Sequence, residues 1–135
     1  MEKAIWSTVS LVKDTPEAIQ RFVSWHLAMG ADHMHLFFDD PNDPSIAMLA
    51  PLDRVTATPC DGEFWTQLMG KPVLKRHGRR QNGATAFGYR QVQQGWVLNL
   101  DCDEFIYSPL KPVSDILRDQ LWTSTLTHAL NVLQG

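Results

Sequence analysis

The chain of 135 residues has few cysteines, no long hydrophobic run and no excess of basic residues. Its two cysteines, Cys60 and Cys102, show no C-x-x-C spacing, which argues against a disulfide framework or a zinc motif and favours a reducing, cytoplasmic location. No stretch reaches the ~18 apolar residues of a membrane helix. The apolar run near Met1 is also too short for a signal peptide. We therefore expect no transmembrane segment, while peripheral contact with a membrane stays open.

The charge balance excludes a typical nucleic-acid-binding protein. There are 12 Lys and Arg against 15 Asp and Glu, a formal net charge of -3, whereas nucleic-acid binders usually show a basic excess. The one dense basic stretch, at 75–80, is either a solvated loop and helix start or a local phosphate site. Hydrophobic residues make up 44% and charged residues 20%, the balance of a globular protein. The length predicts one domain spanning 1–135.

Apolar segments separated by turn signals predict alternating strands and helices. Strands are expected at 4–12, 33–38, 54–59 and 96–100, where β-branched, aromatic and apolar residues cluster. A helix should follow the first strand, with Thr15 as its cap and Gly30 as its stop. Further helices are expected at 45–49, 79–94 and 112–121, with 60–78 irregular. This order predicts an α/β fold with a mostly parallel sheet and helices on both faces.

Two of the expected strands end in acidic residues. Asp39 and Asp40 follow the second strand, and Asp101, Asp103 and Glu104 follow the last. Carboxyl ends of parallel strands share one edge of the sheet, where ligands bind. Closely spaced carboxylates repel one another, and a hard divalent cation offsets that repulsion. Each acidic group could also be an ordinary solvated turn, and neither is a specific motif alone.

Two blocks of sequence resemble family 2-like bacterial glycosyltransferases. The segment from Trp25 to Asp40 contains a Trp, a His, a Gly and a closing Asp pair, and it resembles one block of that family. The segment from Gly95 to Ile106, GWVLNLDCDEFI, resembles the family's W-x-x-x-x-D-x-D-E-F block. The blocks occur in the family's order, and the likeness covers roughly residues 4–120. The Asp-x-Asp-Glu-Phe run after an apolar strand is its most specific part.

The resemblance implies a GT-A-like three-layer sandwich that transfers a sugar from a nucleoside diphosphate, guessed to be UDP, to an unknown acceptor. It implies that Asp101 and Asp103 hold Mn²⁺ or Mg²⁺ together with the diphosphate. The residues implied to bind the nucleotide-sugar are Ser10, Val12, Lys13, Asp39, Asp40, Arg80, Gln81, Asp101 and Cys102. Arg80 and Gln81 could instead be an exposed helix start. No catalytic residue is matched.

Other functions stay open, because members of the family generally continue well past the Asp-x-Asp motif and this sequence ends at Gly135. The chain could be a transferase with a minimal acceptor site, a truncated or degenerate nucleotide-binding domain, or a protein-interaction module. A phosphotransfer enzyme is disfavoured, because its Asp-x-Asp motif would follow the first strand.

Several single residues have competing interpretations. His26 lies on the apolar stripe of the first helix, where a core histidine that orients a loop is favoured over a ligand. His33 and His35 point to one face of a strand, but no third metal ligand has matching spacing. Trp65 could touch a sugar ring.

Overall fold

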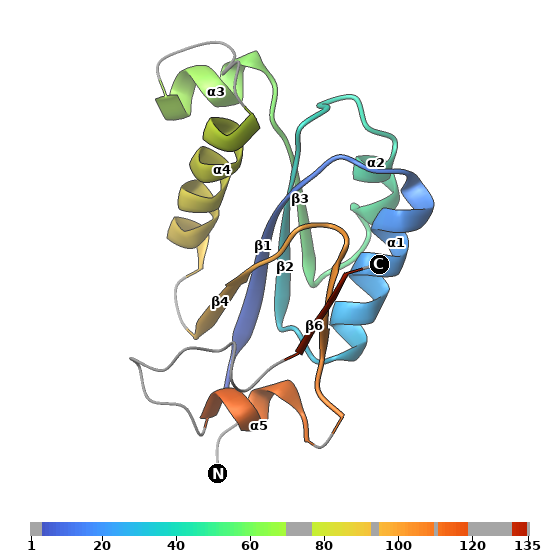
Figure 1. Cartoon of the computed structure of the whole chain (residues 1–135). Coiled ribbons are helices and arrows are strands. Elements are labelled where there is room, and N and C mark those ends of the chain that lie inside the picture. The colour runs from blue at the N-terminus through green and yellow to red at the C-terminus, as the bar shows by residue number, and fades with distance from the viewer. Residues whose placement is uncertain (1–3, 70–76, 93–94, 110, 119–130, 135) are drawn as a thin grey trace.

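The structure is a computed structural model that describes residues 4–69, 77–92, 95–109, 111–118 and 131–134; the side chains at 69, 77–82 and 131–134 lie outside the description. Figure 1 shows a sheet between two layers of helices. The predicted α/β class with helices on both faces is confirmed, and the architecture is compatible with a GT-A-like sandwich. Within the described ranges, no helix is long and apolar enough to span a bilayer.

The central sheet has four parallel strands in the order β3-β2-β1-β4. They are β1 (Trp6–Val12), β2 (His33–Phe38), β3 (Val55–Pro59) and β4 (Trp96–Asn99). These bounds lie within about two residues of those expected from the sequence. A parallel sheet needs apolar cover on both faces, which the helices supply.

Two helices cover each face of the sheet. On one side, called here the α1 face, lie α1 (Pro16–Ala28) and α2 (Ser45–Leu49). The predicted start of α1 is confirmed, because Thr15 Oγ1 accepts a hydrogen bond from the Ala18 N–H at 3.2 Å. Gly30 follows the helix with a φ of 101°, which a glycine adopts without strain.

The opposite side, called the α4 face, carries α3 (Gly62–Met69) and α4 (His77–Gln91). The expectation of an irregular segment at 60–78 is wrong where the structure describes it. Asp61 Oδ1 caps α3 by accepting from the Phe64 N–H at 2.8 Å, and Trp65 is buried on this face. Packing of these aromatic side chains, which local composition did not signal, stabilises the helix.

Each face has its own apolar core. The α1-face core is the larger and contains, among others, Trp6, Val12, Phe22, Met34, Leu36 and Phe38. The α4-face core contains Val9, Phe37, Cys60, Trp65 and Ala84. Gly88 lets α4 approach this face closely, since an added Cβ would lie 2.5 Å from Val9 Cγ1 and 3.0 Å from Phe37 Cε2. Close packing of α4 on the sheet therefore requires a glycine at position 88.

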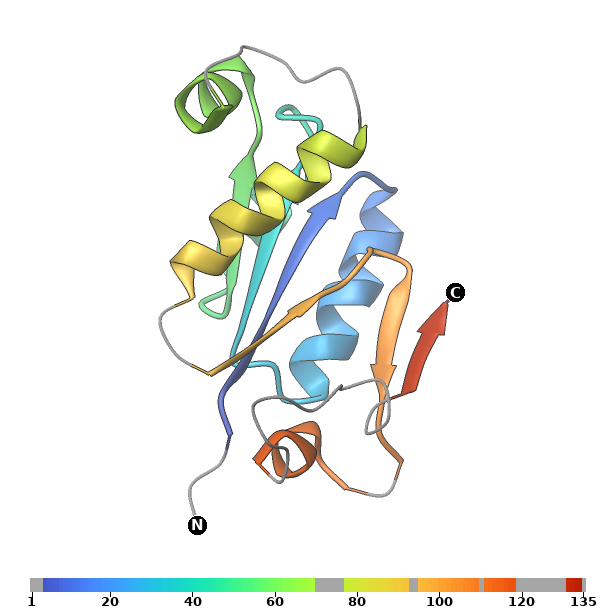
Figure 2. The ribbon, with the colours of Figure 1, turned by 60° about the vertical axis from the view of Figure 1, so that its left-hand side comes forward.

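After β4 the chain forms a small antiparallel pair that the sequence did not predict. It consists of β5 (Glu104–Tyr107) and β6 (Asn131–Gln134), and α5 (Val113–Arg118) lies between them in sequence. The helix expected at 112–121 is thus confirmed over its described part. Figure 2 shows the pair beside α1, away from α4. Its first strand, β5, directly follows the Asp-x-Asp segment.

Candidate functional site

The order of the strands reverses between β1 and β4. From β1 the chain moves outward through β2 to β3, and it then returns to place β4 on the other side of β1. In open parallel sheets, ligands bind at the carboxyl ends of the strands beside such a reversal. β4 pairs only with Trp6–Val9, so the last residues of β1, Ser10–Val12, extend past the end of β4. The chain that follows β4 therefore leaves the sheet at this reversal point.

That chain is a short turn, called here the acidic turn, which runs from Asp101 to Glu104. The Leu100 N–H donates to Val9 O at 3.1 Å, which anchors the start of the turn on β1. The Glu104 N–H donates to Asp101 O at 2.9 Å, and Glu104 Oε1 accepts from the Asp101 N–H at 2.8 Å. Glu104 thus closes the turn, while the side chains of Asp101 and Asp103 are exposed.

Four carboxylates lie within electrostatic reach of Cys102. Burial and then, in decreasing order, Asp14, Asp103, Asp101 and Asp43 together raise the pKa of its thiol to about 12. Asp14 follows β1 after Lys13, and Asp43 precedes α2. The sequence reasoning missed both. Their positions after parallel strands were a signal, but many acidic residues follow strands, and only the fold brings these two near the acidic turn.

Asp39 and Asp40 lie at the same edge of the sheet as the acidic turn, as the parallel topology requires. Asp39 lies within electrostatic reach of Cys60, whereas the carboxylates of the acidic turn act on Cys102. Burial and then, in decreasing order, Asp39 and Asp61 together raise the pKa of the Cys60 thiol to about 12. Cys60 belongs to the α4-face core, whereas Cys102 packs against the α1-face core, so the acidic residues near the two thiols form two groups at this edge.

Asp40 has a local structural role. Its Oδ1 accepts a hydrogen bond from the Asn42 N–H at 3.0 Å, and its carbonyl accepts from the Asp43 N–H at 3.1 Å. This is the turn-forming role that Asp commonly plays before a proline-containing segment. Asp39 and Asp40 both stay candidates for a contact with a nucleoside.

The remaining predicted residues occupy varied environments. Ser10 and Val12 are fully buried on the α1 face, and Lys13 is exposed just beyond β1. Ser10 Oγ has no hydrogen-bond partner among the residues that the structure describes. Arg80 and Gln81 lie in the first turns of α4, which begins at the carboxyl edge of the sheet (Figure 2), but their side chains are outside the description.

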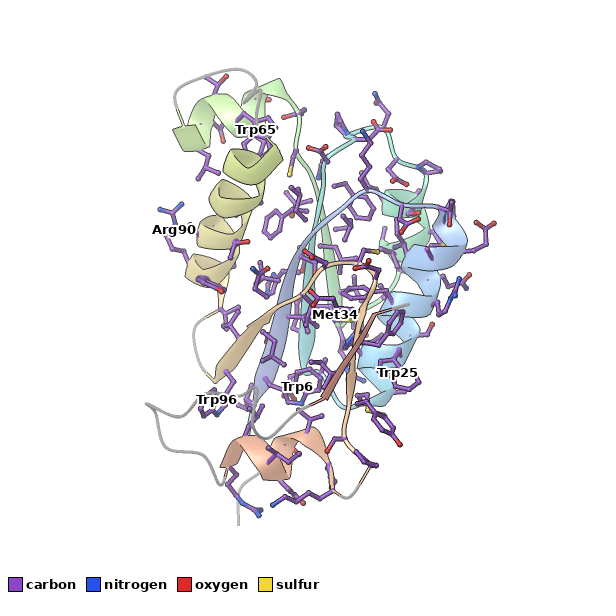
Figure 3. All side chains as sticks on the ribbon, in the orientation of Figure 1. Trp6, Trp25, Met34, Trp65, Arg90 and Trp96 are labelled. Carbon is purple, nitrogen blue, oxygen red and sulfur yellow. The ribbon has the colours of Figure 1, made fainter. Side chains whose placement is uncertain are left out.

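Trp65 is not available to a sugar. Its side chain is 2% exposed and packs edge-on against Phe64, with ring centroids 4.9 Å apart. Figure 3 shows it near the junction of α3 and α4. The suggestion that it touches a sugar ring is wrong, because the segment around it is a packed helix rather than an open loop.

The donor atoms of the acidic turn suit a hard cation. Asp101 and Asp103 offer carboxylate oxygens, which Mg²⁺ and Mn²⁺ prefer. A thiol whose pKa is raised to about 12 stays protonated at neutral pH, so Cys102 adds no thiolate that would favour a softer metal. Over the described ranges, no three His, Cys, Asp or Glu side chains are grouped to hold a metal. Two carboxylates could supply only part of a cation's ligands, so phosphate and water would have to supply the rest.

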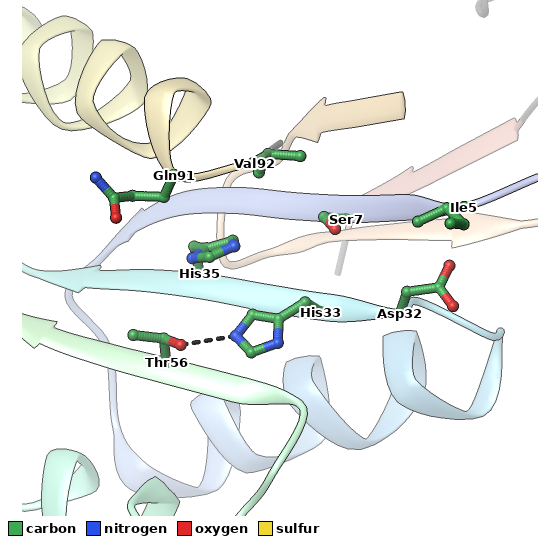
Figure 4. Close-up of a pocket in the computed structure, with 8 residues that line it drawn as sticks. All are labelled: Ile5, Ser7, Asp32, His33, His35, Thr56, Gln91 and Val92. Carbon is green, nitrogen blue, oxygen red and sulfur yellow. Dashed lines mark hydrogen bonds between the residues drawn. The ribbon is translucent and has the colours of Figure 1, made fainter. Parts of the chain in front are cut away.

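A separate open cavity of about 420 Å³ lies toward the start of β2, near the C-terminal end of α4. His33 and His35 line it, with ring centroids 4.6 Å apart, and His33 Nε2 is 2.6 Å from Thr56 Oγ1 (Figure 4). Burial lowers the pKa of both rings. Arg54 lowers that of His33 further, and His33 adds to the shift of His35, to about 4. Both rings are therefore neutral at pH 7.

Asp32 lies near this histidine pair. It is hydrogen-bonded through Oδ2 to the Trp6 N–H at 2.8 Å, and Figure 4 shows its carboxylate directed away from the two rings. Among the described residues, no third His, Cys, Asp or Glu side chain joins the two rings as a possible metal ligand. The acidic turn is the stronger candidate site because it lies at the carboxyl edge beside the strand reversal, whereas the cavity lies toward the start of β2.

Comparison with known proteins finds no matching family model, no matching curated protein and no matching solved structure.

Proposed function

We propose that the chain is a metal-dependent glycosyltransferase domain that transfers a sugar from a nucleoside diphosphate donor. The single observation that supports this most is the position of the acidic turn at the reversal point between β1 and β4. Exposed carboxylates at such a point lie where α/β proteins bind nucleotides. The resemblance of the Asp-x-Asp-Glu-Phe run to the family supports the same function independently of the fold.

In this proposal, Asp101 and Asp103 bind Mn²⁺ or Mg²⁺, and the diphosphate of the donor completes the coordination shell. The bound cation stabilises the negative charge that develops on the departing diphosphate. Asp14 and Asp43 add negative potential around Cys102, which favours a cation there even though neither is required as a ligand. Asp101 and Asp103 are thus the residues on which activity depends most.

The nucleoside is proposed to lie over the carboxyl ends of β1 and β2. Asp39 can accept hydrogen bonds from a base N–H or from ribose hydroxyls. Lys13, which is exposed after β1, and Arg80, in the first turns of α4, are proposed to approach the phosphates. UDP is the first nucleotide to test, the acceptor is unassigned, and a cytoplasmic location is part of the proposal.

Calorimetric titration with UDP, with and without Mn²⁺, tests the proposal. Wild-type protein is expected to bind UDP only with the metal. Asp101→Asn and Asp103→Asn should each weaken that binding at least about tenfold, as expected for loss of a metal ligand. Asp53→Asn is the matched control, because Asp53 is exposed just before β3, at the other end of the strands, and it should leave the affinity unchanged.

Hydrolysis or transfer of a UDP-sugar then separates an active transferase from a domain that only binds the nucleotide. Metal-dependent binding without turnover would support a degenerate nucleotide-binding module. Absence of binding to UDP, GDP, ADP, CDP and dTDP, with or without Mn²⁺, would overturn the proposal and leave a protein-interaction module.

A further inference from the structure

Two consecutive side chains of α1 hold the backbone of one residue of β5, Ile106. The Ile106 N–H donates to His26 Nε2 at 3.1 Å, and the Ile106 carbonyl accepts from Trp25 Nε1 at 2.7 Å. Ile106 is buried, so its peptide groups need partners within the protein. Figure 3 shows Trp25 on α1, where the helix faces the antiparallel pair. The helix thus supplies the two hydrogen bonds that a neighbouring strand would otherwise make.

The bonds of His26 require one protonation state of its ring. Its Nδ1 lies 2.8 Å from Phe22 O, which can only accept, so Nδ1 carries a proton. Its Nε2 receives the Ile106 N–H and must therefore be unprotonated. Only the neutral Nδ1–H tautomer satisfies both contacts. Burial lowers the pKa of His26, against the opposing effect of the Phe22 hydrogen bond, and this favours the neutral ring.

Aromatic contacts also hold β5 against α1 around His26; this contact between β5 and α1 is called here the junction. The Phe105 ring is stacked on His26 at 5.9 Å and lies edge-on to Trp25 at 5.9 Å, and Phe22 lies 4.6 Å from His26 between ring centroids. The groups packed against the His26 ring are thus aromatic rings and two peptide groups, and no charged side chain among the described residues contributes to its lowered pKa.

The acidic turn is held at both ends, by β1 before it and by the contact between β5 and α1 after it. Its start is tied to β1 through the Leu100 N–H and Val9 O, and its end continues into β5, whose Ile106 is tied to α1. Glu104 is both the residue that closes the turn and the first residue of β5. A displacement of β5 from α1 would therefore move Glu104 and open the turn that carries Asp101 and Asp103.

We propose that His26 and Trp25 are positioning residues for the acidic turn. By holding the backbone N–H and carbonyl of Ile106, they set the spacing of Asp101 and Asp103. This spacing in turn sets the affinity of the turn for a cation and diphosphate. The consequence for ligand binding rests on the proposed function. The mechanical link from α1 to the turn does not. Protonation of Nε2 removes the acceptor for Ile106 and weakens the link.

Three variants test the proposal. His26→Leu removes the acceptor and substitutes an apolar side chain of similar size. His26→Gln keeps an acceptor at about the position of Nε2. Trp25→Phe removes the N–H donor and keeps an aromatic ring. His33→Gln, on the other face of the sheet, is the matched control. Circular dichroism establishes which variants are folded.

The first measurement is amide hydrogen exchange, which needs no nucleotide. His26→Leu should accelerate exchange at Ile106 and also at Asp101 and Glu104, because opening of the junction reaches the turn. His26→Gln should restore slow exchange, and Trp25→Phe should give an intermediate rate. Faster exchange at Ile106 alone, with Asp101 and Glu104 unchanged, would overturn the proposal. If His26→Leu does not fold, Trp25→Phe and His26→Gln decide the question by the same criterion.

The second measurement is the Mn²⁺-dependent affinity for UDP. His26→Leu should weaken it about tenfold, the usual effect of losing a residue that orients a metal ligand, and His26→Gln should recover most of it. Wild-type affinity should also fall as His26 is protonated, and this step should be missing from the pH profile of His26→Gln. Unchanged affinity in His26→Leu would overturn the proposal while leaving the proposed function intact. No binding by the wild type would refute the function alone, and the exchange data would still test the link.

Discussion

The two faces of the sheet differ in how completely they are covered. On the α1 face a long helix packs over a continuous apolar core, and even its polar ring, His26, has both nitrogens hydrogen-bonded. On the α4 face one long helix approaches closely at Gly88 but leaves the His33–His35 cavity open beside it. The same four strands thus support a closed face that positions the acidic turn and a face that is partly solvated. We expect the stability of the fold to depend mainly on the first.

The largest loss of stability is expected from removing an aromatic side chain, and it should differ between the two faces. Phe22→Ala on the α1 face should lower the free energy of unfolding by about 3–5 kcal/mol, because it leaves a cavity beside His26 and Phe105. Phe87→Ala on the α4 face should cost only about 1–2 kcal/mol, since Phe87 is half-buried. Urea unfolding measures both, and equal losses would mean that the two faces contribute alike.

A smaller effect is expected from overpacking the α4 face. Gly88→Ala should lower the free energy of unfolding by about 1 kcal/mol or more, because the new Cβ meets Val9 at 2.5 Å and the cost of overpacking exceeds the gain in helix propensity. Ala86→Gly, at an exposed position of the same helix, measures the propensity effect by itself. A stabilised Gly88→Ala variant would show that α4 can move away from the sheet at little cost.

The remaining effect is absent at neutral pH and concerns the solvated part of the α4 face as the pH falls. The pKa of His35 is about 4 in the folded protein and about 6.5 in an unfolded chain, so the unfolded state binds the proton first as the pH falls. This contribution to stability is complete above pH 6.5 and is lost progressively from there to about pH 4. His35→Gln should therefore flatten the fall in the urea midpoint over this range.

His33→Gln sharpens the same test. It removes the neighbouring ring that helps to lower the pKa of His35, so His35 should titrate at a higher pH, which chemical shifts of its ring protons would report. An unchanged titration would mean that burial alone accounts for the shift.

Local patterns were sufficient for most of the fold. Alternating apolar segments placed β1, β2 and β3, and Thr15 and Gly30 marked the ends of α1, because strand periodicity and helix capping depend on neighbouring residues. α3 was missed because its stability comes from packing of Trp65 in the α4-face core. β5 and β6 were missed because their pairing joins residues far apart in the chain, and such pairs leave little local signal.

The candidate site was predictable only in part. The position of Asp101 and Asp103 after an apolar strand was visible in the sequence, and so was their shared edge with Asp39. The sequence could not show that Asp39 lies near Cys60 whereas Asp14 and Asp43 lie near Cys102. It favoured His26 as a core residue that orients a loop. The structure confirms the core position, but the partner, Ile106, lies in strand β5 and could not be named from the sequence.

The sequence by itself determined that the strands are parallel and that their acidic ends meet at one edge, because connection through a helix makes successive strands point the same way. The tertiary structure alone decided that β4 returns to the far side of β1, which cysteine each carboxylate lies near, and that α1 holds β5. These features depend on the order of strands across the sheet and on hydrogen bonds between residues about 80 positions apart, and no local pattern encodes them.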